Sequence, residues 1–145
     1  QVSGKINGFK GPYRYLSNFW PARVTLDGAE YPSTEHAYQA AKTLDKEARE
    51  RIRQCEKPGA AKRMGGKAKL RADWENVKLS VMEDLLRQKF AHKELGDLLL
   101  GTGHMELVES NHWGDVWWGV DAQKGGLNHL GRLLMLIRSE LRGDK

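Results

Sequence analysis

Apolar side chains recur at helical spacing along two stretches of the chain, residues 74–92 and 130–141. In each stretch they return every three or four residues, which places them on one face of a helix. These two stretches therefore predict core helices, the first of them with Asp73 as its N-cap. The apolar residues are Val77, Val81, Met82, Leu85, Leu86 and Phe90 in the first stretch, and Leu130, Leu133, Leu134, Ile137 and Leu141 in the second.

Turn-forming residues predict the shorter elements. Asp27-Gly28 separates residues 22–26 from residues 29–31, and a two-residue turn of this type predicts a β-hairpin. Gly and Pro interrupt the chain again at 57–59 and 65–66, where we expect helices to end. The remaining expected elements are helices over residues 46–55, 60–64 and 94–100, a strand over 105–109 and an aromatic loop over 13–21.

Residues 31–42 differ from the core helices because their helical stripe is polar. Ser33 is predicted as the N-cap, and Glu35, Gln39 and Lys42 then fall at i, i+4 and i+7 on one face. Such a stripe suits the wall of a binding site. It is also ordinary solvated surface, since the helix dipole favours an acid in the first turn. The periodicity leaves both interpretations open.

Aromatic residues gather in two loops. The first, residues 13–21, includes Asn18 and Phe19. In the second, residues 110–120, three of the five tryptophans lie within six residues, beside Asp115. Rings in such loops either fill the core or stack on a planar ligand. We favour a ligand for the tryptophan loop, because glycines interrupt it and a carboxylate accompanies the rings.

Length and composition bound the class of protein. The 145 residues suffice for one domain with its own core, and we expect a single domain over residues 1–145. No apolar run is long enough to cross a membrane, and residues 1–5 lack the apolar part of a signal peptide. We therefore expect an intracellular, cytoplasmic monomer. The single cysteine, Cys55, excludes an internal disulfide, and no cluster has metal-ligand spacing, so we expect no metal.

The formal net charge of +5 is unevenly distributed. Residues 42–72 hold eleven basic and four acidic residues, whereas the rest of the chain holds 13 basic and 15 acidic ones. A segment of this kind predicts an anionic partner such as a phosphate, a pyrophosphate or a nucleic-acid backbone. A solvated helix face rich in Lys and Arg is the alternative interpretation.

Short motifs recur in a defined order along nearly the whole chain. They are Tyr13-Arg14-Tyr15-Leu16-Ser17-Asn18-Phe19, residues 30–42, Ala61-Lys62 with Gly65, Arg71-Ala72-Asp73-Trp74, Lys89-Phe90, Asn111-x-Trp113-Gly114-Asp115-x-x-Trp118-Gly119 and Gly126-x-Asn128-x-Leu130-Gly131. Each motif is weak by itself, but their joint order and spacing resemble the NADAR family, also called YbiA-like.

The resemblance implies an α+β fold, mainly α-helical, in one compact domain with a short N-terminal β-hairpin and few short strands. It also implies an N-glycosidase-like activity that needs no cofactor. Two substrate classes are attached to the family: ADP-ribose linked to guanine in nucleic acid, and phosphoribosylated pyrimidine intermediates of riboflavin synthesis. Because the loop with Trp113, Trp117 and Trp118 is more aromatic than in the riboflavin-linked bacterial members, we favour ADP-ribosylated guanine, as a nucleotide or in DNA or RNA.

The resemblance further implies that Glu35 is the active-site acid, Lys42 the helix lysine and Asp115 the aspartate of the site. In both substrates the ribose C1 is bonded to an exocyclic amine, so Lys42 is expected to attack by transimination while Glu35 moves protons. Direct hydrolysis with two carboxylates stays open. The expected substrate-binding residues are Arg14, Asn18, Phe19, His36, Gln39, Lys62, Trp74, Asn111, Trp113 and Trp118.

Two other classes of function remain as alternatives. A non-catalytic module that binds ADP-ribose or NAD needs the aromatic and basic residues, but it has no need of Glu35 together with Lys42. A basic nucleic-acid-binding domain accounts for the charge of residues 42–72 and leaves the tryptophan loop unexplained. The sequence therefore favours an enzyme.

Overall fold

The structure is a computed structural model and describes residues 4–144. These residues form two compact units, Asn18–Lys89 and the remainder of the described chain, and each unit is described by itself. Helices outnumber strands in residues, so the expected α+β fold of mainly helical character is confirmed. The single domain over residues 1–145 stays a prediction.

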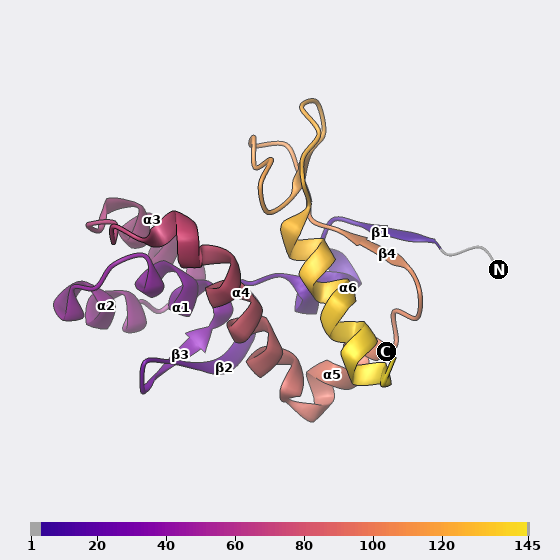
Figure 1. The fold of residues 1–145 in the computed structure, drawn as a ribbon, viewed down its shortest axis with the longest axis horizontal. Helices are drawn as coiled ribbons and strands as arrows, with labels where there is room; N and C mark the ends of the chain where they lie inside the picture. The colour runs from indigo at the N-terminus through magenta and orange to yellow at the C-terminus, as the bar shows by residue number, and fades with distance from the viewer. Residues whose placement is uncertain (1–3, 145) are drawn as a thin grey trace. The chain divides into compact units, whose positions relative to one another are not determined.

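The unit Asn18–Lys89 begins with a β-hairpin that leads directly into helices (Figure 1). Strands β2 and β3 pair antiparallel around Asp27 and Gly28, whose φ angles of 48° and 86° are typical of the tight turns that join hairpin strands. The predicted hairpin is thereby confirmed. The bounds are Pro21–Leu26 for β2, Ala29–Ser33 for β3, Thr34–Ala41 for α1, Lys46–Arg53 for α2, Pro58–Lys67 for α3 and Trp74–Ala91 for α4.

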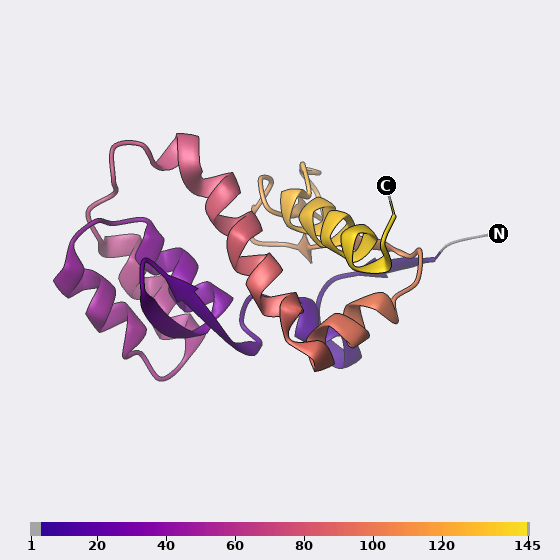
Figure 2. The ribbon, with the colours of Figure 1, turned by 60° about the horizontal axis from the view of Figure 1, so that its bottom comes forward.

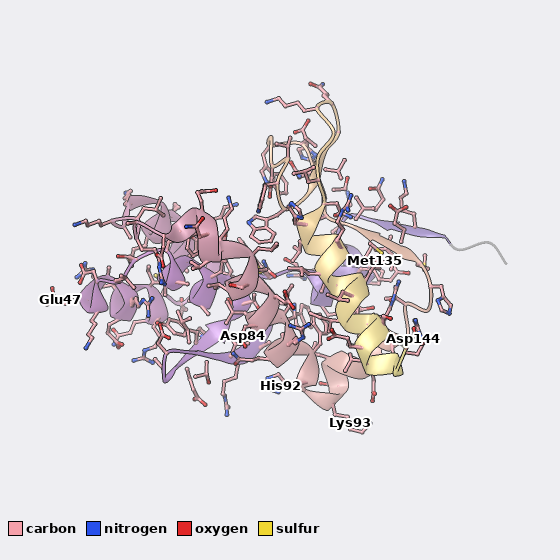
Figure 3. The ribbon with its side chains drawn as sticks, viewed as in Figure 1. Glu47, Asp84, His92, Lys93, Met135 and Asp144 are labelled. Atoms are coloured by element: carbon pink, nitrogen blue, oxygen red, sulfur yellow. The ribbon has the colours of Figure 1, made fainter. Side chains whose placement is uncertain are left out.

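Helix α1 lies at the centre of this unit. It packs against the hairpin, α2 and α3, and all eight of its residues are buried. Small side chains such as those of Ala37, Ala40 and Ala41 allow the neighbouring elements to approach closely. In contrast, Glu47 of α2 and Asp84 of α4 are exposed and mark outer faces of their helices (Figure 3). The polar stripe predicted on α1 is therefore not solvated surface.

The other unit combines two pairs of short parallel strands with helices. Strand β1 pairs with β4, β5 pairs with β6, and α6 packs against β4 and α5 (Figure 2). The bounds are Lys5–Asn7 for β1, Gly11–Leu16 for the 3-10 helix η1, Lys93–Leu100 for α5, Glu106–Val108 for β4, Ser110–Asn111 for β5, Val120–Asp121 for β6 and His129–Arg142 for α6.

The two predicted core helices are present as α4 and α6. Their predicted apolar faces are mostly buried, but Val77 and Val81 of α4 are half-buried, and Leu141 at the C-terminal end of α6 is 40% exposed. The buried members are Met82, Leu85, Leu86 and Phe90 of α4, and Leu130, Leu133, Leu134 and Ile137 of α6.

Two predictions of local structure were wrong. Residues 13–21 were expected to form a loop, but Gly11–Leu16 is a 3-10 helix and Pro21 already begins β2. Pro12 favours this turn, because its fixed φ suits the first position of a helix. The helix expected to end at Gly65-Gly66 instead continues to Lys67. Packing of α3 against α1 outweighs the weak helix propensity of the two glycines.

No helix among residues 4–144 is long and apolar enough to cross a membrane. The expected cytoplasmic location rested partly on residues 1–3, which lie outside the described residues, and it stays a prediction.

Gly65 of α3 lies directly against Gln39 of α1. A Cβ atom at this position would lie 2.2 Å from Gln39 Oε1 and 2.7 Å from Gln39 Cβ, whereas a Cβ at the neighbouring Gly66 would meet nothing within 4 Å. The absence of a side chain at Gly65 is therefore what lets Gln39 fit between the two helices.

We expect Gly65→Ala to lower the free energy of unfolding by about 1–3 kcal/mol, the usual cost of overpacking a core. Gly66→Ala is the matched control, because it adds a methyl group to the same helix in open space. It should raise the free energy of unfolding by about 0.5–1 kcal/mol through higher helix propensity. Urea titrations followed by circular dichroism measure both changes, and equal effects of the two substitutions would contradict the packing argument.

Candidate functional site

The start of α1 is fixed by Ser33, as predicted. The Ser33 hydroxyl accepts a hydrogen bond from the backbone N–H of His36 at 3.1 Å and also lies 2.7 Å from His36 Nδ1. The other ring nitrogen of His36, Nε2, is hydrogen-bonded to the carbonyl oxygen of Cys55 at 2.8 Å. Burial lowers the pKa of His36. Both ring nitrogens are therefore engaged inside the protein, and the expected contact of His36 with substrate stays a prediction.

Glu35 and Gln39 are hydrogen-bonded to each other on α1. Gln39 Nε2 donates to Glu35 Oε2 at 2.6 Å, and the backbone N–H of Glu35 donates to the carbonyl of Asn18 at 3.1 Å. The Glu35 residue is 7% exposed and Gln39 is 3% exposed. A buried carboxylate needs such donors, because the charged form loses its hydration. Gln39 therefore holds Glu35 in one orientation.

Lys42 follows at the C-terminal end of α1, where burial and charge act on its amine in opposite directions. Burial has the largest effect and lowers the pKa of Lys42; the cations of Lys62 and Lys78 lower it further, while the carboxylate of Glu35 raises it. The net pKa of Lys42 is lower than that of an ordinary lysine. Its Nζ lies 5.6 Å from the centre of the Tyr38 ring. A larger share of this amine is therefore neutral, and nucleophilic, near pH 7.

The Tyr38 ring lies near this amine, and a second ring packs against Tyr38. Trp74, at the start of α4, packs against Tyr38 of α1 with their ring centres 5.2 Å apart and their planes inclined by 58°. Trp74 is 5% exposed, so it is held rigidly within the unit. We call the residues so brought together the α1 cluster: Glu35, Tyr38, Gln39, Lys42 and Trp74.

Asn18 and Phe19 precede β2 in the same unit. Asn18 Nδ2 lies 3.6 Å from Met82 Sδ, and Asn18 Oδ1 is buried without a hydrogen-bond partner among the described residues. Gln39 Oε1 is a second buried acceptor of this kind. Phe19 is 43% exposed. The two amide residues thus keep acceptor oxygens that no described protein group satisfies.

The tryptophan loop of the other unit is built around Asn111. The Asn111 side chain is 3% exposed; its Oδ1 accepts from the backbone N–H groups of Trp113 and Asp115, and its Nδ2 donates to the carbonyl of Asp115. These bonds hold the loop in shape, and the expected contact of Asn111 with substrate stays a prediction.

Asp115 is half-buried in this loop. Its Oδ1 accepts from the backbone N–H groups of Trp117 at 3.1 Å and Trp118 at 2.9 Å. No described residue donates a hydrogen bond to the second oxygen, Oδ2. The carboxylate is thus oriented by one oxygen, and the other remains for a ligand.

The rings of the loop differ in exposure. Trp113 is 61% exposed and meets His112 edge-on, with ring centres 5.6 Å apart. Trp118 is half-buried near His129, 6.4 Å between ring centres. Arg14 lies exposed in η1 of this unit. Of the predicted site residues, the structure therefore groups Glu35, Gln39, Lys42 and Trp74 in one unit, and places Arg14, Asn111, Trp113, Asp115 and Trp118 in the other.

Some residues of these sites escaped sequence reasoning. Tyr38 lies one turn before Lys42 on α1, and this spacing would have identified it. Lys78 acts on Lys42 from another helix, a relation that no local spacing reveals. Asp121 accepts backbone N–H bonds from Gly114, Gln123 and Lys124, and so ties the tryptophan loop to the following turn.

An open groove of about 790 Å³ lies in the unit that contains β1, β4 and α6. Its charged lining residues include Lys5, Asp121 and Arg132, but the Asp121 carboxylate is already bonded to backbone N–H groups. None of the predicted site residues lines this groove, so its volume does not define the candidate site.

The α1 cluster combines an amine of lowered pKa, a buried carboxylate and two rings. An amine of this kind attacks an electrophilic carbon, and a carboxylate nearby transfers protons. No group of three or more His, Cys, Asp or Glu residues that could bind a metal ion occurs within residues 4–144.

Comparisons with known proteins agree with this chemistry. N-glycosidase YbiA of Escherichia coli (strain K12) is 45% identical over 138 residues, which cover 92% of this chain and 84% of that protein. Riboflavin biosynthesis protein VVA0006 of Vibrio vulnificus (strain YJ016) is 38% identical over 130 residues, 88% of this chain and 35% of that protein. The NMR structure of E. coli YbiA matches with a TM-score of 0.85 and 42% identity, over 98% of this chain and 87% of that chain.

The predicted class of enzyme, a glycosidase that hydrolyses N-glycosyl bonds, is confirmed by relatives of that name that match most of the chain. The sequence profile of the NADAR domain matches residues 7–142. The chain therefore belongs to the NADAR domain family.

Proposed function

We propose that this protein hydrolyses the N-glycosyl bond between ADP-ribose and a guanine base, and so reverses ADP-ribosylation of nucleic acid in the cytoplasm. The observation that carries the proposal is the α1 cluster, in which Lys42 has a lowered pKa and lies two helical turns after the buried acid Glu35. Seven residues of α-helix rise ~10.5 Å. A ribose and the lysine side chain can bridge this distance.

The chemistry of the bond gives Lys42 a defined task. In such a substrate the ribose C1 carries the exocyclic amine of guanine, and opening of the sugar ring converts C1 into an imine carbon. The neutral Lys42 amine adds to C1, and the C1–N bond to guanine breaks as Glu35 gives a proton to the departing amine. A Lys42 imine with the sugar remains.

Hydrolysis of this imine completes the reaction. Glu35, now a carboxylate, takes a proton from water as the oxygen bonds to C1. The C1–N bond to Lys42 then breaks, the amine regains its proton and the sugar ring closes. Gln39 keeps Glu35 oriented through both proton transfers, because it donates to Oε2 at 2.6 Å. Direct attack of water on C1, with Lys42 only a cation, is the alternative route.

The binding of the sugar and base rests on groups with unused hydrogen-bonding capacity. In the unit that holds the α1 cluster, Asn18 Oδ1 and Gln39 Oε1 are buried acceptors without described partners. Ribose hydroxyls and amines are the donors that such oxygens need. The exposed ring of Phe19 in the same unit offers a face on which a base can stack.

A second substrate is favoured by the relatives. Two of them are named riboflavin biosynthesis proteins, one from Vibrio vulnificus and one from Zea mays. Phosphoribosylated pyrimidine intermediates of that synthesis carry the same bond from ribose C1 to an exocyclic amine, so the α1 cluster serves either substrate. We favour ADP-ribosylated guanine because of the exposed Trp113.

One experiment tests the choice of substrate. The protein is incubated in parallel with an oligonucleotide ADP-ribosylated on guanine and with the ribosylaminopyrimidine phosphate, and release of the base is followed by chromatography. We expect release from the oligonucleotide at the higher kcat/KM. Release from the pyrimidine alone would identify the riboflavin branch, and reaction of neither would favour a module that binds ADP-ribose without cleaving it.

Lys42→Ala should lower kcat by at least about 10³-fold, because it removes the nucleophile. Glu35→Gln should lower kcat by roughly 10²–10⁴-fold, because an amide transfers no proton. Lys46→Ala is the control, since this exposed lysine of α2 lies outside the α1 cluster, and it should leave kcat unchanged. Circular dichroism checks that each variant is folded.

Borohydride reduction should attach the sugar covalently to the wild-type protein, at the peptide that contains Lys42. Mass spectrometry of the digested protein identifies the adduct, which should be absent from Lys42→Ala and present in Lys46→Ala. A Lys42→Ala protein that retains turnover would contradict the imine route and leave direct hydrolysis.

The pH dependence follows from the charges around Lys42. Attack needs the neutral amine, so kcat/KM rises with pH through the pKa of Lys42, which burial and two cations lower. Lys62→Gln removes one of these cations; the charged amine is then less disfavoured, its pKa rises, and the rising limb of the profile shifts to higher pH. Lys67→Gln, which removes a charge farther along the same helix, is the control. An unmoved limb in Lys62→Gln would contradict this assignment.

A further inference from the structure

Residues 57–71 contain six basic residues and no acidic one, and we call them the acid-free segment. It comprises the whole of α3 and the link that follows it. Four of its cations are exposed and belong to no ion pair among the described residues: Lys57, Arg63, Lys67 and Lys69. Arg71 differs, because its guanidinium is bound by Asp73 at 2.6 Å.

The neighbouring helix α2 shows the usual arrangement. There Arg53 is paired with Glu50, and Arg49 is paired with Asp27 at 2.7 Å. Lys46 and Arg51 of α2 are exposed and belong to no ion pair among the described residues, but acids lie between them in the sequence. The acid-free segment differs because it holds four such cations and no acid.

The cations of the acid-free segment lie where they weaken the fold. Arg63 and Lys67 are one helical turn apart, and like charges at this spacing destabilise a helix by about 0.2–0.5 kcal/mol. Lys57 is the N-cap of α3, at the positive end of the helix dipole, and the first turn of α3 carries no acid to offset it. Charges that are placed against these helix preferences, with no compensating interaction, are expected at functional sites.

The acid-free segment is joined directly to the α1 cluster. The backbone N–H of Arg71 donates to the carbonyl of Lys42 at 2.7 Å, and the charge of Lys62 lowers the pKa of Lys42. The acid-free segment and the α1 cluster are therefore neighbours within one unit. Exposed apolar residues, Met64 and Leu70, lie among the cations and give bases or sugars a surface to rest on.

We propose that the acid-free segment binds the phosphate backbone of the nucleic-acid strand that carries the modified guanine. This inference rests on the proposed function and adds that the substrate is a strand rather than a free nucleotide. A strand brings several phosphates to the protein, enough for the four unpaired cations, and its phosphates remain attached to the base held at Lys42. An anionic membrane surface matches the charge but offers nothing to the α1 cluster.

The test measures binding without turnover. Anisotropy of a labelled, unmodified single-stranded oligonucleotide gives the affinity of the full chain at several salt concentrations. Lys67→Gln/Lys69→Gln should weaken binding by about tenfold and reduce the slope of log K against log salt by about 1.4, since each phosphate contact contributes about 0.7 for single strands. Lys46→Gln/Arg51→Gln removes the same charge from exposed positions of α2 and should change both quantities little.

Turnover then separates this inference from the proposed function. On an ADP-ribosylated mononucleotide the two double variants should match the wild type, whereas on the modified oligonucleotide Lys67→Gln/Lys69→Gln alone should show a raised KM. Equal loss of binding in both double variants would overturn the inference and indicate attraction by net charge. Binding to vesicles with anionic lipid but not to the oligonucleotide would also overturn it. A wild-type protein inactive on both substrates would defeat the proposed function while leaving the strand-binding result readable.

Discussion

The complete burial of α1 is the constraint on which the candidate site depends. A helix surrounded by a hairpin and two further helices cannot expose its polar side chains, so each must find a partner inside or keep its hydrogen-bonding capacity for a ligand. Glu35 is satisfied by Gln39, and Gln39 fits because Gly65 of α3 has no side chain. Burial also acts on Lys42, where the loss of hydration makes the charged amine less stable.

Opposing influences act on the pKa of Lys42. A carboxylate at Glu35 favours the charged amine, and without opposing influences it would hold Lys42 as an ion pair. Burial together with Lys62 and Lys78 outweighs that attraction, and the net pKa falls. The basic residues around α1 therefore have two effects at once: they attract anions, and they keep an amine reactive beside an acid. In a site with Glu35 but without these cations, the pKa of Lys42 would be higher and less of its amine would be neutral.

The sequence predicted much of this fold from particular residues. Asp27-Gly28 identified the hairpin, Ser33 the start of α1, and the apolar spacing α4 and α6. It failed at Gly65-Gly66, where contact with α1 keeps the helix intact, because propensity is local and packing is not. The same limit applies to the site. Glu35, Gln39 and Lys42 follow one another on one helix, so spacing places them together. The hydrogen bonds of His36 to Cys55 and of Asn111 within its loop depend on the folded chain, and no spacing predicts them.

Two buried oxygens that lack hydrogen-bond donors suggest why such a site is retained. A buried acceptor without a donor costs about 1–3 kcal/mol, and Asn18 Oδ1 and Gln39 Oε1 are two of them in one unit. An apolar side chain of similar shape at either position would avoid this cost, but it would bind no sugar hydroxyl. The like charges of Arg63 and Lys67 on α3 carry a similar penalty. All of these destabilising contributions arise within the unit that holds Lys42. Each becomes smaller when a ligand with hydrogen-bond donors and several negative charges is bound. The fold is thus less stable than its packing allows in the places where the proposed substrate, an ADP-ribosylated strand, would supply the missing partners.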